Sequence, residues 1–157
     1  INRDDKNISV ANIKTTDFED RRGTISFDYD INISNQVLDL DKEKYITIDY
    51  DQEFRNFDFD STRTKDYEYD YDYFSVKKIE VTLPAGYKVS HLPEAVEKTT
   101  PHFTFKLKYR QEGNKVIYTK ELSIDNAIIP KSTFKEWNEA VKQLRKAYGD
   151  QLILTKS

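Results

Sequence analysis

The stretch 133-TFKEWNEAVKQLRKAY-148 decides the fold, because it is the one segment of the sequence with a clear helical period. Its apolar residues recur at steps of three and four, which places them on one stripe of a helix: Phe134, Trp137, Val141, Leu144 and Tyr148. The opposite face is polar and carries Lys135, Asn138, Glu139, Lys142 and Lys146. Thr133 and Glu136 have the spacing of a capping box, and Gly149 is a typical helix stop. We therefore predict one helix from about residue 133 to residue 148.

Apolar residues elsewhere alternate with polar ones, which is the period of a half-buried strand. The pattern predicts strands at 8–14, 24–33, 45–50, 54–60, 66–74, 76–83, 87–92, 102–109, 115–124 and 151–155, with a loop at 94–101. Gly113 and Asn114 separate two of these segments as a hairpin turn would. Many short strands at turn spacings predict an all-β fold, an antiparallel β-sandwich of the jelly-roll-like type with one C-terminal α-helix.

Composition sets the size and nature of the expected core. The chain has 157 residues, which suits a single domain over 1–157, with a possible soft boundary near 34–44. Only 37% of the residues are apolar, but they include nine Phe, eleven Tyr and one Trp. We therefore expect a thin core rich in aromatic rings, of the kind found between two packed layers.

The sequence lacks the residues and motifs that several classes of enzyme and binding protein require. There is no Cys, which removes disulfides, thiol nucleophiles and cysteine metal sites. There is also no serine elbow, dinucleotide fingerprint or P-loop, and carboxylates are too numerous to single out an acid–base pair. We predict no catalytic residue, no cofactor and no metal site. The chain contains no Met and opens at Ile1, so we expect a processed protein or an excised domain, without a membrane-inserted segment.

The charges are distributed unevenly. Residues 39–74 contain twelve acidic and five basic residues, whereas residues 101–157 contain eleven basic and six acidic ones. The first interpretation is that these two regions neutralise each other as neighbours in the fold. The second is a basic face for an acidic partner. Nucleic acid is not the expected partner, because the basic residues alternate with core positions instead of clustering.

The segment 66-DYEYDYDYF-74 is the most unusual in composition. As a strand it places four tyrosines on one face: Tyr67, Tyr69, Tyr71 and Tyr73. Four carboxylates, Asp66, Glu68, Asp70 and Asp72, occupy the other. We expect a half-buried strand with its acidic face in solvent. A sugar-stacking platform and a cation site are the alternatives, although carboxylates spread along a strand do not converge on one ion.

The two histidines, His91 and His102, are the remaining candidates for a metal site. They could act together as ligands if their strands were neighbours. Their spacing matches no metal motif, and we expect them to be ordinary sheet or loop residues.

A resemblance enters with the segment 79-IEVTLPAGYKVSHLPEAV-96. Its ordered pieces are Leu83-Pro84, Gly86-Tyr87, Val89 and Leu92-Pro93. Five further pieces follow in order: an aromatic strand, a hairpin, Ile129-Pro130, a helix that contains Phe-x-x-Trp with its tryptophan at Trp137, and a final Leu-Ile-Leu strand. This set resembles the β-rich region of unknown function that follows the core of large bacterial transglutaminase-like envelope proteins. The resemblance covers about residues 63–156.

The resemblance implies a non-catalytic accessory or interaction domain. Its partner would be the preceding catalytic core of the same polypeptide or another envelope protein, in the periplasm or outside the cell. The family's catalytic Cys-His-Asp set belongs to that core and has no counterpart in a chain without Cys. The matching residues here are structural: Pro84 and Pro93 bracket a short strand, and Gly86 permits a turn. The alternative function is a carbohydrate-binding β-sandwich module.

Overall fold

The computed structural model describes residues 8–15, 27–34 and 36–157. Within these ranges 51% of the residues are in strands and 14% are helical, which confirms the predicted antiparallel β fold with a single C-terminal α-helix. The chain divides into two compact units between Leu38 and Asp39, inside the stretch 34–44. Residues 24–26 of the strand predicted at 24–33 lie outside the described ranges.

The first unit contains one antiparallel hairpin of β1 (Ile8–Thr15) and β2 (Phe27–Ile33). Ile8 pairs with Ile33 and Val10 with Ile31, so the apolar residues share one face as their alternation predicts. The register shifts at Asn12, which has a positive φ of 54°. Asn adopts this left-handed conformation more readily than most residues, and here it does so at the β-bulge that shifts the register.

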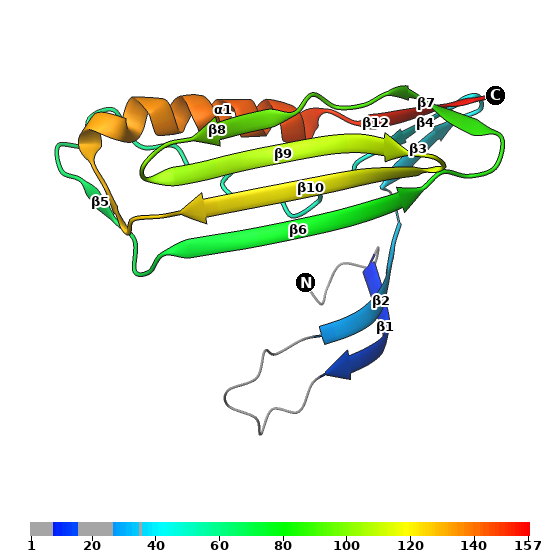
Figure 1. Cartoon of the computed structure of the whole chain (residues 1–157), viewed down its shortest axis with the longest axis horizontal. Coiled ribbons are helices and arrows are strands. Elements are labelled where there is room, and N and C mark those ends of the chain that lie inside the picture. Colours follow the sequence, from blue (N-terminus) through cyan, green and yellow to red (C-terminus); the bar gives the residue numbers. More distant parts are fainter. Residues whose placement is uncertain (1–7, 16–26, 35) are drawn as a thin grey trace. The chain divides into compact units, whose positions relative to one another are not determined.

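The larger sheet of the second unit has four antiparallel strands (Figure 1). Their order is β6 (Tyr73–Thr82), β10 (Lys115–Ile124), β9 (Phe103–Glu112) and β8 (Val96–Thr99). The last three are consecutive in the chain and β6 lies beside β10, which is the Greek-key arrangement. The predicted hairpin is confirmed, and its turn has Gly113 at a φ of 58°.

One of these strands was predicted as a loop. The segment 94–101 contains β8, which pairs with β9. The prediction was wrong because Val96 is the only buried residue of this strand, and its other residues are polar. An alternation of apolar residues therefore never develops over its four positions, although pairing with β9 still makes it a strand.

A second four-stranded antiparallel sheet has the order β3 (Val37–Leu40), β4 (Glu43–Ile46), β12 (Leu152–Lys156) and β7 (Tyr87–His91). A small core cluster of Leu83, Val116, Leu152 and Leu154 joins this sheet to the ends of β6 and β10. The turn from β6 to β7 runs through Pro84 and Gly86, whose φ is 78°, as the motif required. Tyr87 and Leu92 pack half-buried against the same cluster, and Pro93 follows β7 as a buried residue.

The helix α1 runs from Phe134 to Gly149, after a 3-10 turn, η1 (Lys131–Thr133). The helix prediction is confirmed, and Thr133 is the N-cap residue as predicted, but the predicted capping box and the predicted stop at Gly149 are wrong. Thr133 donates its hydroxyl to the Pro130 carbonyl at 2.7 Å, because the 3-10 turn already holds it, while Glu136 pairs with Lys98. Gly149 is the last helical residue, and Asp150 is the C-cap.

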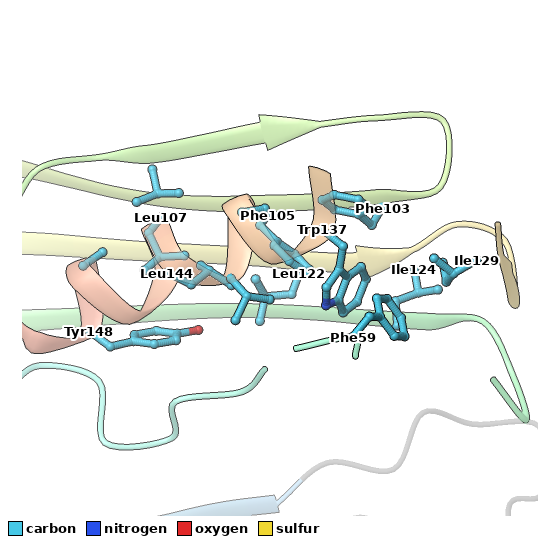
Figure 2. Packing of buried hydrophobic residues seen from close by; sticks show 14 of the residues in the cluster. Phe59, Phe103, Phe105, Leu107, Leu122, Ile124, Ile129, Trp137, Leu144 and Tyr148 are labelled. Carbon is cyan, nitrogen blue, oxygen red and sulfur yellow. The ribbon is translucent and has the colours of Figure 1, made fainter. Parts of the chain in front are cut away.

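The apolar stripe of the helix forms the main core (Figure 2). Trp137 is fully buried, and the centroids of its ring and those of Phe103 and Phe105 lie 5.0 and 5.1 Å apart. Phe59 stacks on Phe134 with centroids 4.1 Å apart. The indole nitrogen donates a 2.7 Å hydrogen bond to the Phe57 carbonyl, which satisfies the one polar group of the ring. The predicted aromatic core is thus present, and Trp137 of the helix lies among its rings.

The segment 47–60 differs from its prediction. Strand β4 ends at Ile46, and residues 54–60 form no strand, since Phe54 has a φ of 60° inside a turn. The backbone of Phe59 forms its hydrogen bonds with a helix side chain, where a strand would bond to a neighbouring strand. The Asn138 side chain accepts a hydrogen bond from the Phe59 N–H at 2.8 Å and donates to the Phe59 carbonyl at 2.9 Å. Asn138 therefore faces this segment, whereas the helical pattern placed it on the solvent side.

Candidate functional site

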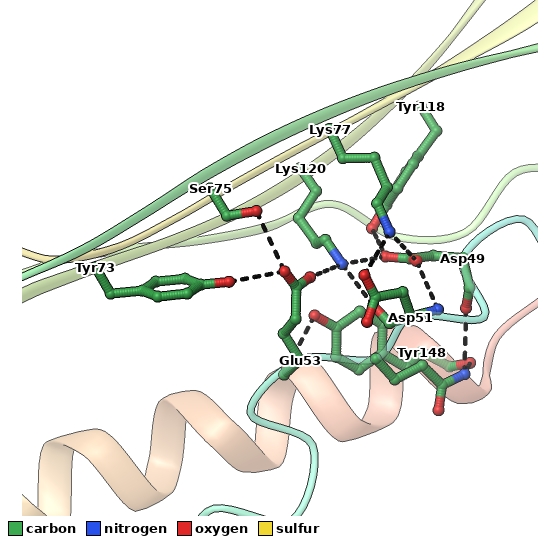
Figure 3. A network of polar contacts seen from close by, with 10 residues as sticks. Asp49, Asp51, Glu53, Tyr73, Ser75, Lys77, Tyr118, Lys120 and Tyr148 are labelled. Atoms are coloured by element: carbon green, nitrogen blue, oxygen red, sulfur yellow. Dashed lines mark hydrogen bonds and ion pairs between the residues drawn. The ribbon is translucent and has the colours of Figure 1, made fainter. Parts of the chain in front are cut away.

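A group of charged and hydroxyl side chains lies between the larger sheet and the C-terminal end of α1 (Figure 3). We call it the buried ion cluster, and its members are Asp49, Asp51, Glu53, Tyr73, Ser75, Lys77, Tyr118, Lys120 and Tyr148. Alternation builds it. Every second residue of β6 and β10 points inward, so Lys77 and Lys120 meet as direct cross-strand neighbours, and the acids come from alternate positions of the segment 49–53.

Lys120 is the centre of this cluster. Its side chain is fully buried, and its Nζ lies 2.6 Å from Asp49 Oδ2. The same Nζ donates to the Asp51 carbonyl at 2.6 Å and contacts Glu53 Oε2. The ring of Tyr148 lies 5.5 Å from it. A buried ammonium must be paired and hydrogen-bonded to avoid a large desolvation cost, and these contacts meet that requirement.

The two acids that contact Lys120, the buried Asp49 and the partly buried Glu53, are held by further donors. Asp49 is 5% exposed, accepts a hydrogen bond from the Tyr118 hydroxyl at 2.8 Å and lies 3.2 Å from Lys77 Nζ. Glu53 accepts from the Tyr73 hydroxyl at 2.8 Å and from Ser75 Oγ at 3.2 Å. Each carboxylate therefore bridges the segment 49–53 to the inner face of the sheet.

The environment of the cluster shifts the titration of its own members. Burial raises the pKa of the Tyr118 and Tyr148 hydroxyls well above their ordinary value, and the charge of Asp49 raises both further. At Lys77, burial alone would lower the pKa, but hydrogen bonds to Asp51 and Asp49 outweigh it and leave the pKa raised. The cluster thus favours neutral phenols beside charged lysine–carboxylate pairs.

The raised tyrosine pKa values predict a loss of stability in alkaline solution. The folded state keeps Tyr118 and Tyr148 protonated, while an unfolded tyrosine ionises near pH 10. Their contribution is therefore complete below about pH 10 and decreases as the pH rises further, by roughly 1.4 kcal/mol per pH unit for each residue. Urea unfolding at increasing pH measures this slope. Tyr118→Phe, which keeps the ring without the ionisable hydroxyl, should reduce it, and an unchanged slope would contradict the assignment.

Sequence reasoning anticipated part of this cluster. The acidic region 39–74 and the basic region 101–157 were expected to neutralise each other, and Lys120 with Asp49 and Arg145 with Asp58 are such pairs. The cluster itself was missed. One sequence signal could have revealed it: each of two strands has a lysine at a position that its apolar alternation assigns to the inner face. These are Lys77 in β6 and Lys120, between Tyr118 and Leu122, in β10.

The tyrosine segment 66–74 is not one strand. A short strand β5 (Tyr67–Glu68) pairs with β11 (Ile128–Ile129), and the Tyr69 N–H extends this pairing by donating to the Ala127 carbonyl at 2.8 Å. A bend at residues 70–71 separates it from β6. Three of the tyrosines are half-buried against the aromatic core: Tyr67, Tyr69 and Tyr73. Tyr71 is 67% exposed. The prediction of four tyrosines on one face is wrong, whereas the four carboxylates are exposed as expected.

The histidines lie apart in the fold. His91 is on β7 and contacts Asp150 at 3.0 Å, whereas His102 directly precedes β9 in the other sheet. Within residues 8–15, 27–34 and 36–157 there is no group of three or more His, Asp or Glu side chains arranged to hold a metal ion. Among these same residues, no helix has the length and apolar character needed to cross a membrane.

A very small cavity borders the buried ion cluster. Its volume is about 10 Å³, and Asp49, Tyr109 and Tyr148 are among the residues that line it. The pocket is partly open, and its volume is enough for a single water molecule beside Asp49.

These features define a small sandwich-like β domain, closed on one side by a helix and tied together by a buried ion cluster. Residues 43–154 match the family model of DUF3858, described as a domain of unknown function with a solved structure. Because the match covers well over half of the sequence, the chain belongs to this family. Comparisons with curated proteins and with solved structures gave no match.

Proposed function

We propose that the domain is a non-catalytic accessory module of a larger transglutaminase-like protein of the bacterial cell envelope, and that it contacts the catalytic core of the same polypeptide. Two observations support this proposal. The family match starts at residue 43 and spans the motif set, from Leu83-Pro84 to the Leu-Ile-Leu strand, that resembles the region after such cores. The inner face of the larger sheet is filled by aromatic rings and by the buried ion cluster, so this face serves the core of the domain and a contact with another domain has to use the outer surface.

The observation that carries the proposal is an exposed apolar patch on β6, formed by Phe74 and Val76, with the exposed Tyr71 two residues before the strand. Phe74 is 73% and Val76 is 63% exposed, although both belong to a regular strand. Strand β6 is also the edge of its sheet, since within the described residues it pairs with β10 alone. Large apolar side chains on a free edge strand are typical of a contact surface.

A partner in the same polypeptide fits the small size of this patch. Three side chains bury little area, so a freely diffusing partner would bind weakly. A linked partner has an effective concentration in the millimolar range, at which a weak contact is occupied. The patch therefore favours a neighbouring domain over a separate envelope protein.

The proposal predicts measurable binding when the two parts are produced separately. Calorimetric titration of this domain with the catalytic core should show a weak complex, and Phe74→Thr combined with Val76→Thr should weaken it by about tenfold or more, a change of 1.4 kcal/mol. Threonine keeps the strand propensity of the edge. The matched control is Lys88→Thr, an exposed change on β7. Absence of binding by the unchanged domain, or equal effects of patch and control variants, would contradict the proposal.

The carbohydrate-binding alternative keeps one supporting feature, the exposed ring of Tyr71. Tyr67 and Tyr69 contact each other and Phe57 with centroids 5.0 to 5.7 Å apart, so they serve the core and do not form an open stacking platform. We expect no specific glycan binding on an array of bacterial and host glycans. Specific binding that Tyr71→Ala and Tyr69→Ala both abolish would replace the accessory function by this alternative.

A further inference from the structure

We propose that the buried ion cluster is a modification site, at which Lys120 and Asp49 join through an intramolecular amide bond with Glu53 as the proton carrier. The product would be an isopeptide cross-link between β10 and the segment that follows β4. This inference stands on the geometry of the cluster and does not depend on the proposed accessory function.

The first requirement is that the two reacting groups are held together away from water. Lys120 Nζ lies 2.6 Å from Asp49 Oδ2, and the side chains of Lys120 and Asp49 are 0% and 3% exposed. The contacted oxygen is bonded directly to the carboxyl carbon that an amine would attack. Groups fixed in this way react as if at very high concentration, with effective molarities of roughly 10⁵–10⁸ M for well-oriented pairs.

The second requirement is a group that moves protons. Glu53 Oε2 contacts Lys120 Nζ, and the other carboxylate oxygen of Glu53 accepts hydrogen bonds from Tyr73 and Ser75. These two donors fix the carboxylate beside the amine, so a general base is already positioned at the nucleophile.

The third requirement is activation of the carboxyl group. Tyr118 donates its hydroxyl to Asp49 Oδ2 at 2.8 Å, and Lys77 Nζ lies 3.2 Å from Asp49 Oδ1. Donors on both oxygens stabilise the negative charge that develops when an amine adds to the carboxyl carbon, as an oxyanion hole does.

The reaction balances without any added reagent. The Lys120 ammonium gives one proton to the Glu53 carboxylate, and the freed amine adds to the carboxyl carbon of Asp49. One oxygen of Asp49 then leaves as water, with the proton carried by Glu53 and a second proton from the attacking nitrogen. The C–O bond breaks, the C–N bond forms, and Glu53 returns to its carboxylate form. The cavity of about 10 Å³ next to Asp49 has room for the released water.

Burial also favours the product. A buried ammonium and a buried carboxylate each carry a desolvation cost, and an amide removes both charges at once. Glu53 keeps its charge, but its side chain is 20% exposed and accepts hydrogen bonds from Tyr73 and Ser75. Exclusion of bulk water limits the reverse reaction once the released water has left the pocket, since hydrolysis needs a water molecule at the bond. Folding would therefore be expected to precede the cross-link, because only the folded chain brings Lys120, Asp49 and Glu53 together.

Intact-mass spectrometry of the purified, folded domain tests the proposal. The unchanged chain should be lighter than its sequence mass by one water molecule. Lys120→Arg should have its full sequence mass, and so should Glu53→Gln, which keeps the shape of the side chain but removes the base. The matched controls are Lys146→Arg and Glu94→Gln, which alter an exposed lysine–carboxylate pair and should leave the loss of water unchanged.

Peptide mapping locates the bond. A proteolytic fragment that links the peptide containing Lys120 to the peptide containing Asp49 would support the proposal. A folded, unchanged chain with its full sequence mass would overturn it, whatever the variants do. A loss of water that maps to Glu53 as the bonded acid, or that persists in Lys120→Arg, would overturn it equally.

Discussion

Trp137→Ala is expected to lower the free energy of unfolding by about 3–5 kcal/mol, the usual cost of removing a large aromatic ring from a core. The indole is fully buried and touches rings from three parts of the chain, among them Phe54, Phe59 and Phe103. Its hydrogen bond to the Phe57 carbonyl is lost as well, which leaves a backbone acceptor without that partner. Such a loss is a large part of the roughly 5–15 kcal/mol that stabilises a domain.

Urea unfolding compares this variant with Lys142→Ala, an exposed change on the same helix. The lysine variant should lose less than about 0.5 kcal/mol. Equal midpoints for the two variants would mean that the apolar stripe of α1 contributes little to the core in solution, and that the packing in Figure 2 is wrong.

Lys120→Met is the second change for which a large loss is expected, about 3–5 kcal/mol. Methionine fills a similar volume but leaves Asp49 and Glu53 without the cation that lies between them. Lys77 also pairs with Asp49, but its contacts are divided between Asp49 and Asp51. The main cause of the loss is the removal of all three Lys120 contacts, which join β10 to Asp49, Glu53 and the Asp51 carbonyl.

Lys146→Met provides the matched control, because it removes the lysine from another lysine–carboxylate pair. Lys146 and Glu94 are both 82% exposed, and such surface pairs contribute about 0–1 kcal/mol. Thermal or urea unfolding of both variants distinguishes the two sites. If the two lysine variants were equally stable, the cluster would be hydrated in solution and would not hold buried charges.

The helix and most of the strands could be predicted because their apolar residues repeat with the period of the element. The stripe around Trp137 and the alternation in β10 both report which face is buried. The same rule failed for residues 54–60, where alternating phenylalanines face the helix without any strand pairing. It also failed for β8, because pairing with β9 forms that strand and its own four residues carry no pattern.

The candidate site was less accessible to sequence reasoning, for a physical reason. Lys77 and Lys120 become neighbours only through the register of β6 with β10, and Asp49 approaches them only after β4 has ended. The register of two strands and the course of a loop depend on tertiary contacts, so they cannot be predicted from the residues of one segment alone. The attraction between an acidic and a basic half could be expected from charge counts, but not the particular lysine that becomes buried.

The position of β12 in its sheet has a consequence for biosynthesis. Strand β12 ends at Lys156 and lies between β4 and β7, which do not pair with each other in the described structure. During translation both strands therefore remain without β12 as a neighbour until residues 152–156 have left the ribosome. The hairpins of β8, β9 and β10 involve only local contacts and can form earlier. The nascent chain would thus expose β7 without a partner and β4 with only β3 beside it until the end of this segment emerges, which makes that interval the one in which binding by a chaperone would matter most.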